Sequence, residues 1–125
     1  MPISTAEAAQ ILNKVFGGTN FTAESVWYVG LRSGGVELSG SSYARVAVTN
    51  NTTNFPAIAA NIKVNGTVIT FPAASADWLT ADEVAIYIAS SGGTPKYTGT
   101  LDQTVTVLSG QTRQFAAGDL VIKFI

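Results

Sequence analysis

The sequence predicts an all-β protein: an antiparallel β-sandwich or jelly-roll-like barrel preceded by a short N-terminal helix. Three observations support this fold class. In residues 84–89, Val and Ile alternate with Ala and Tyr, which is the period of a strand. Similar segments recur at short intervals and are separated by turns rich in Gly, Asn and Ser. No helical pattern lies between them, so parallel βαβ units are not expected.

The helix is predicted over residues 5–16. Ser4 and Glu7 match a capping box, in which each side chain satisfies a backbone N–H at the helix start. Gly17 and Gly18 end the helical pattern. The apolar stripe of this helix consists of Ala8, Ile11, Leu12, Val15 and Phe16. It packs either on the protein's own domain or on a neighbouring subunit.

Seven or eight short strands are predicted, and the clearest lie at residues 26–31, 43–49, 61–64, 67–71, 84–89, 104–108 and 120–125. Asn65-Gly66 is the pair best suited to a two-residue hairpin, because both residues tolerate a positive φ. We therefore expect it to join the third and fourth strands, with Ile62 opposite Ile69.

The last predicted strand alternates up to the end of the sequence, and it should be held in a sheet. The side chains expected to face the core are Leu120, Ile122 and Phe124. Val121 and Ile125 lie on the opposite face, where a neighbouring subunit can cover them.

The length of 125 residues indicates one domain, residues 1–125, with a core large enough to fold without metals or disulfides. The chain contains neither His nor Cys. Nucleophilic triads and transition-metal sites rely on these residue types. We therefore expect a protein that is not an enzyme and that has no catalytic residues, no metal site and no cofactor.

A pair of carboxylates is the remaining route to acid–base catalysis. Asp77, Asp82 and Glu83 lie close in sequence, but neighbouring side chains before a strand point to different sides. Their spacing also does not match a calcium loop. A solvated turn is the expected structure.

Charge and hydropathy limit the possible partners. Only 12% of residues are charged and the net charge is −1, without a basic cluster, so nucleic-acid binding is not expected. No apolar run approaches the ~20 residues that span a bilayer, so no membrane partner is expected. The N-terminus lacks the pattern of a signal peptide.

Aromatic residues on the predicted strands leave two alternatives. They can stack on sugar rings, as in receptor-binding proteins, or serve as anchors in a core or interface. The residues concerned are Trp27, Tyr28, Tyr43, Trp78, Tyr87 and Tyr97.

Seven segments in order resemble a family of small tailed-phage virion proteins, described as tail fibre proteins and in some phages as capsid decoration or cement proteins. The segments are FGGT at 16–19, VGL at 29–31, VELSGSSYAR at 36–45, TFPAA at 70–74, DW at 77–78, SGG at 91–93 and FAAGDL at 115–120. Together they extend over nearly the whole chain, which makes the resemblance more specific than any one segment.

The resemblance implies a β-sandwich subunit of a virion, made in the cytoplasm of the host bacterium. We expect a capsid decoration or cement protein that contacts copies of itself and the major capsid protein. The alternative is a tail-fibre or tail-tip subunit that contacts tail proteins and a host surface glycan. Low charge suits a covered surface, because desolvating a charge costs more than desolvating a hydroxyl or methyl group.

Six residues are candidates for a subunit interface: Ile11, Phe16, Tyr43, Arg45, Val121 and Ile125. Tyr43 and Arg45 share one face of a predicted strand, where they can form a rigid contact with a neighbour. In the alternative arrangement, they brace Glu37 or a loop carbonyl within the subunit.

Overall fold

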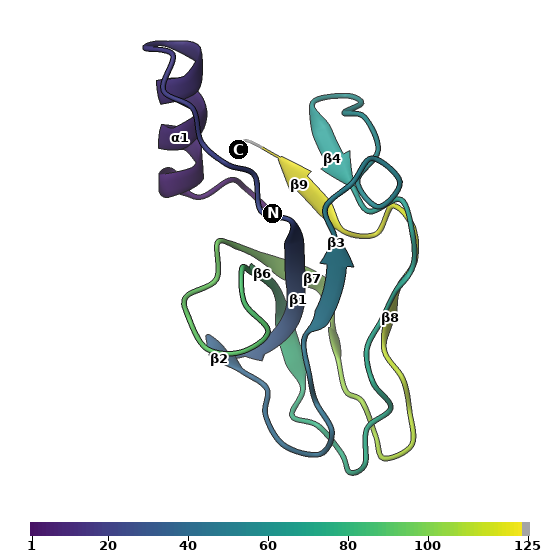
Figure 1. The fold of residues 1–125 in the computed structure, drawn as a ribbon. Helices are drawn as coiled ribbons and strands as arrows, with labels where there is room; N and C mark the ends of the chain where they lie inside the picture. The colour runs from purple at the N-terminus through teal and green to yellow at the C-terminus, as the bar shows by residue number, and fades with distance from the viewer. Residues whose placement is uncertain (124–125) are drawn as a thin grey trace.

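Two layers of antiparallel strands face each other in the computed structural model, which describes residues 1–123 (Figure 1). The all-β prediction is confirmed. The described strands do not close into a barrel, so the fold is a sandwich. Helix α1 (Thr5–Val15) lies to one side of the two layers.

The first layer is a five-stranded sheet organised around β1 (Val26–Ser33). One edge of β1 pairs with β6 (Ala81–Tyr87), which in turn pairs with β7 (Tyr97–Val105). The other edge of β1 is divided between two short strands. β3 (Val46–Thr49) pairs with its first half, and β2 (Val36–Glu37) pairs with its end.

The second layer consists of two separate strand pairs. β4 (Ile62–Val64) pairs with β9 (Val121–Lys123), and β5 (Ile69–Thr70) pairs with β8 (Gln114–Phe115). β5 also lies close to β3 of the first layer. The four strands of the second layer are only two or three residues long, so much of this layer is loop.

The core lies between the layers. β1 and β6 contribute Val29, Leu31, Val84 and Ile86, which alternate with residues on the outer face of the sheet. The second layer contributes Ile69, Phe71, Phe115 and Leu120. Leu38, Phe55, Ala74, Trp78 and Val107 are also buried in this cluster. The segments predicted as strands at 26–31 and 84–89 therefore supply the centre of the fold.

The Asn65-Gly66 hairpin prediction is wrong. Ile62 pairs with Lys123 rather than lying opposite Ile69, because β4 and β5 belong to different strand pairs. Asn65 is only 1% exposed, and its side-chain amide donates to the carbonyls of Thr67 and Ala116 at 2.9 and 3.0 Å. Its Oδ1 accepts a hydrogen bond from the Leu120 N–H at 2.8 Å. The buried Asn65 amide thus joins backbone segments that are distant in sequence. In the predicted hairpin turn, the same side chain would have been exposed to solvent.

Other strand predictions differ from the structure at their boundaries. The strand predicted at 43–49 begins only at Val46, because residues 40–42 have positive φ and turn the chain. The segment 104–108 is not a separate strand, since β7 already ends at Val105. Leu120 and Ile122 pack in or against the core as predicted, whereas Phe124 and Ile125 lie outside the described residues.

The role of Asn65 can be tested by Asn65→Ala. Truncation leaves the Leu120 N–H and two carbonyls without their buried partner, so we expect a loss of about 2–4 kcal/mol in the free energy of unfolding. Denaturant titration measures this loss. Asn13→Ala, on the exposed surface of α1, is the control and should change it by less than about 0.5 kcal/mol.

Candidate functional site

Residues 3–25 form an arm that leaves the sandwich and returns to it (Figure 1). Just before the arm, the Lys123 N–H donates to the Met1 carbonyl at 3.0 Å, and Pro2 forms a parallel bridge with Lys123 of β9. At its other end the arm continues directly into β1. The arm is therefore fixed to both layers of the sandwich.

Local hydrogen bonds define the helix of the arm. Ser4 caps α1 by accepting a hydrogen bond from the Glu7 N–H at 3.3 Å, which is the Ser4 half of the predicted capping box. After Phe16 the chain reverses, and the Thr19 N–H donates to the Asn13 carbonyl at 3.0 Å. Lys14 also bonds Asn20. The returning segment thus runs along the side of the helix that carries Asn13 and Lys14.

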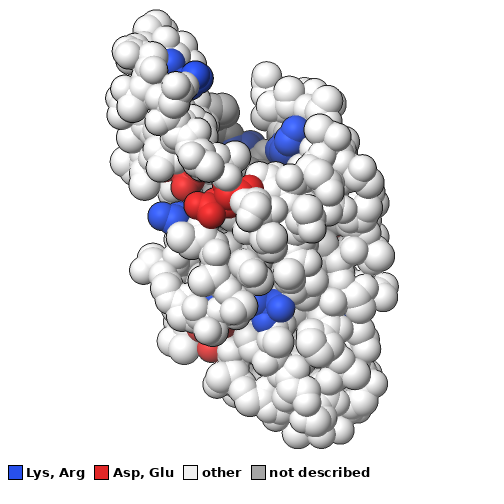
Figure 2. Space-filling model, in the orientation of Figure 1, with Lys and Arg blue, Asp and Glu red and all other residues white. Residues whose placement is uncertain are grey.

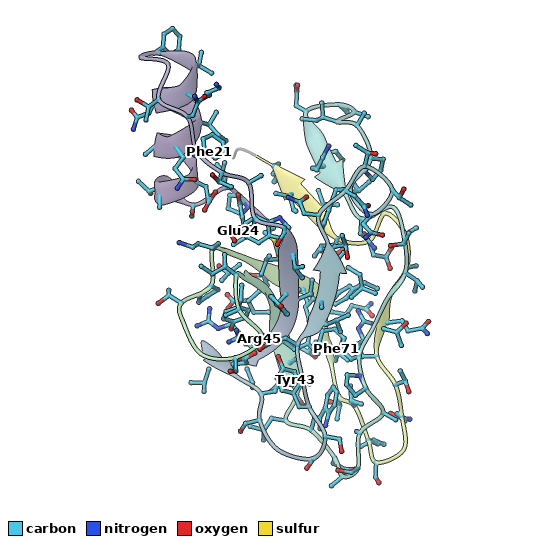
Figure 3. All side chains as sticks on the ribbon, in the orientation of Figure 1. Phe21, Glu24, Tyr43, Arg45 and Phe71 are labelled. Carbon is cyan, nitrogen blue, oxygen red and sulfur yellow. The ribbon has the colours of Figure 1, made fainter. Side chains whose placement is uncertain are left out.

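The opposite side of α1 exposes apolar side chains. Leu12 is 57%, Val15 is 64% and Phe16 is 76% exposed, and no helix residue is buried among the described residues. Phe21, on the returning segment beside the helix, is also exposed (Figure 3). Three residues of the predicted stripe, Leu12, Val15 and Phe16, therefore do not pack on the protein's own domain. An isolated helix of 11 residues is marginal in water, so α1 depends for its stability on contacts outside its own backbone hydrogen bonds.

The base of the arm lies against aromatic residues of the sandwich. The Tyr97 ring of β7 packs edge-to-face on Trp27 of β1, with centroids 5.8 Å apart. Burial raises the pKa of Tyr97 to about 12, and the nearby Glu7 carboxylate contributes to this increase. The Glu7 side chain, in the first turn of the helix, thus lies near Tyr97 of the sheet.

A second candidate region surrounds Tyr43 and Arg45 (Figure 3). The Tyr43 hydroxyl accepts a hydrogen bond from the Leu31 N–H and donates one to Glu37 Oε2, both at 2.9 Å. Arg45 forms a bidentate pair with Glu37, with Nε–Oε2 at 2.7 Å and Nη2–Oε1 at 2.8 Å. The polar groups of Tyr43 and Arg45 are therefore engaged within the subunit.

Arg45 also covers part of the outer face of the sheet. Its guanidinium carbon lies 3.4 Å from the centroid of the Tyr87 ring, and Nη1 donates to the Ala89 carbonyl at 2.7 Å. The side chain is only 3% exposed. This cover explains why Tyr87, on the face away from the core, is nevertheless buried.

The electrostatics of this cluster favour the ion pair. Partial burial by itself raises the pKa of Glu37, but hydrogen bonds from Arg45 and Tyr43 outweigh it, and the pKa lies below its ordinary value. The hydrogen bond to Glu37 raises the pKa of Arg45. Burial raises the pKa of Tyr43, which stays protonated and can donate to Glu37.

The six candidate interface residues are not brought together. Ile11 is half-buried and Phe16 is exposed on the arm, whereas Tyr43 and Arg45 lie at the β1–β2 side of the first layer. Val121 is half-buried in β9, where it pairs with Val64, and Ile125 lies outside the described residues. The sequence analysis did not single out Leu12 and Val15, although both belong to the predicted stripe.

The three carboxylates considered for chemistry each have a separate contact. Asp77 accepts from the Ser109 N–H at 2.7 Å, and Asp82 accepts from the Gly34 N–H at 3.3 Å. Glu83 forms an ion pair with Arg32 at 2.8 Å. Within residues 1–123, no three acidic, His or Cys side chains are grouped to hold a metal ion. The helix in this part of the chain is also too short to cross a membrane.

Five of the six aromatic residues considered for sugar stacking are buried or pack against the core, and the sixth, Tyr28, is half-buried in β1. Trp78 and Tyr87 are buried, and Trp27, Tyr43 and Tyr97 pack against the core. Figure 2 shows that the viewed face is almost entirely uncharged, with its few charged residues in small groups. A contact surface on this face would therefore depend on shape, apolar burial and hydroxyl groups rather than on charge.

Comparison with known protein families identifies the class to which this sandwich and its exposed arm belong. The chain is a bacteriophage virion protein of the fibre type. It belongs to the family described as Podophage GP4 fiber I protein gp80, whose model matches residues 2–123. The resemblance to tailed-phage virion proteins is thereby confirmed. No curated protein matches the chain.

The Glu37 cluster makes stability depend on pH. Because the pKa of Glu37 is lowered in the folded state, its stabilising contribution is complete above the ordinary pKa and is lost as pH falls through the folded-state pKa. Glu37→Gln should lower the melting temperature at neutral pH and reduce its decrease between neutral and acidic pH. Thermal unfolding over this pH range measures both effects. An unchanged pH profile in the variant would contradict the assignment.

Gly30 provides the space in which the cluster sits. A Cβ at this position would lie 2.7 Å from the Tyr43 hydroxyl and 3.0 Å from Glu37 Oε2. Gly30→Ala should therefore lower the free energy of unfolding by about 1–3 kcal/mol, measured by denaturant titration. Ala47→Ser, at an exposed position of the neighbouring strand β3, is the control and should change this free energy by less than about 0.5 kcal/mol. Equal losses in both variants would contradict the prediction.

Proposed function

We propose that this protein is a structural subunit of a phage fibre that attaches to its neighbours through the N-terminal arm. The proposal rests on the difference between the two ends of the molecule. The arm with its exposed apolar residues lies at one end of the sandwich, and a group of connected loops lies at the other (Figure 1). Membership of a fibre family supports the same function.

The loop end comprises residues 38–44, 72–80 and 106–113. Backbone hydrogen bonds connect the three loops: Ser75 N–H to Ser41 O at 3.0 Å and Trp78 N–H to Val107 O at 2.8 Å. Asp77 and Arg113 are the only charged residues in these segments, which are rich in hydroxyl groups. Such loops on a rigid scaffold are suited to contact an external surface, for which a host glycan is the proposed partner.

A capsid decoration or cement protein is the second candidate. Low charge and exposed apolar residues at both ends favour it, because a cement protein spans a junction between capsid subunits. Leu79 and Leu108 at the loop end are 73% and 46% exposed, so this end can also be covered by a neighbour. In either role the protein is proposed to act without catalysis, as part of the virion.

Copy number and position in purified particles distinguish the two functions. Quantitative mass spectrometry against the major capsid protein, with antibody labelling in electron microscopy, provides both. A few copies located at the tail are expected for a fibre subunit. Hundreds of copies distributed over the shell would contradict the fibre proposal and favour the cement function.

Incorporation into particles tests the role of the arm. Leu12→Asp with Val15→Asp places carboxylates on the exposed helix face, where they do not disturb the core. We expect a folded protein that is lost from particles, because covering unpaired carboxylates costs several kcal/mol. Leu79→Ser with Leu108→Ser, at the loop end, is the control and should be incorporated at the wild-type level. Normal incorporation of the arm variant would refute attachment through the arm.

A further inference from the structure

From the exposed face of α1, we infer that two copies of the chain associate by antiparallel packing of their helices. This inference rests on the proposed function, in which the arm is the attachment element, and it names the partner. The paired face consists of Ala8, Ala9, Leu12, Val15 and Phe16. These residues lie within one arc of the helix, as the 3.6-residue period requires.

The face is uncharged and is open from Ala9 to Phe16, whereas Ala8 at its start is half-buried. Leu12, Val15 and Phe16 are mostly exposed, and the returning segment lies on the side of Asn13 and Lys14 instead. The charged residues of the helix, Glu7 and Lys14, both lie off the face. Covering it therefore buries apolar side chains and leaves both charges in solvent.

The sizes of the side chains make the face self-complementary. The small Ala8 and Ala9 are at the first half of the helix, and the larger Val15 and Phe16 are at its end. A twofold axis at Leu12 places Ala8 opposite Phe16 of the second copy and Ala9 opposite Val15. Complementarity of a surface to itself about a twofold axis is what an isologous dimer requires.

Parallel packing lacks these advantages. It would place Phe16 beside Phe16 and Ala8 beside Ala8, so the helices would be crowded at one end and separated at the other. It would also bring like ends of the two helix dipoles together, whereas the antiparallel arrangement joins the Glu7 end of one helix to the Lys14 end of the other. The observations therefore favour a second copy in the antiparallel arrangement.

Disulfide cross-linking tests the geometry, because the chain has no Cys of its own. Packed helix axes lie about 8–10 Å apart and Cα atoms lie about 2.3 Å from each axis, so facing Leu12 positions come within reach of a disulfide. Leu12→Cys should form linked dimers under mild oxidation about tenfold faster than Gln10→Cys, which lies on the opposite side of the helix.

Direction is tested by mixing two single variants. Antiparallel packing predicts that Ala8→Cys and Phe16→Cys cross-link mainly to each other. Self-linked dimers of each variant in place of mixed dimers would show parallel packing and overturn the inference. Equal rates for Leu12→Cys and Gln10→Cys would overturn it as well.

Light scattering provides a measurement that does not depend on the Cys variants. The wild-type chain should be a dimer, and Leu12→Asp should be a folded monomer. A monomeric wild type would overturn the pairing.

The pairing and the proposed function can fail separately. If the wild type is monomeric but the Asp variants are still lost from particles, the pairing fails and the proposed function stands. If Leu12→Asp with Val15→Asp is monomeric but enters particles normally, the proposed function fails and the pairing stands.

Discussion

The sheet depends on satisfying the backbone of β1 along an edge that no single strand covers. β3 pairs with the first half of this edge and β2 with its end, which leaves the Leu31 N–H between them. The Tyr43 hydroxyl accepts that hydrogen bond, and Glu37 and Arg45 hold the hydroxyl in place. Buried backbone groups need hydrogen-bond partners, and here the Tyr43 side chain supplies the acceptor that a paired strand would otherwise provide. Gly30, Tyr87 and the β6–β7 loop are all arranged around this cluster.

The parts of the fold that could be predicted from sequence are those that local patterns determine. The capping box places the helix start, and the alternation of apolar residues locates β1 and β6, because these strands are long and face a core. The pairing of β4 with β9 could not be predicted in this way. Asn65-Gly66 has the local preference for a hairpin, but the buried amide of Asn65 satisfies three backbone groups, two of them far along the chain. Tertiary hydrogen bonds outweighed the local preference.

The candidate site was predicted in part for the same reason. Helical spacing identified the stripe that contains Phe16, but spacing alone does not show which side of a helix faces solvent. The bonding of Tyr43 and Arg45 to Glu37 was one of two arrangements compatible with the sequence, and the structure selects it. Leu12 and Val15 become significant only once the returning segment is seen to occupy the other side of the helix.

The double attachment of the arm determines how the molecule bears mechanical load. The start of the arm is bonded to β9 in the second layer, and its end is continuous with β1 in the first. Tension on the helix is therefore divided between the two sheets and does not peel a single strand from an edge. The interior packing between Leu31, Ile86, Phe71 and Leu120 then resists separation of the layers. A subunit that is pulled through its arm transmits the force through its whole core.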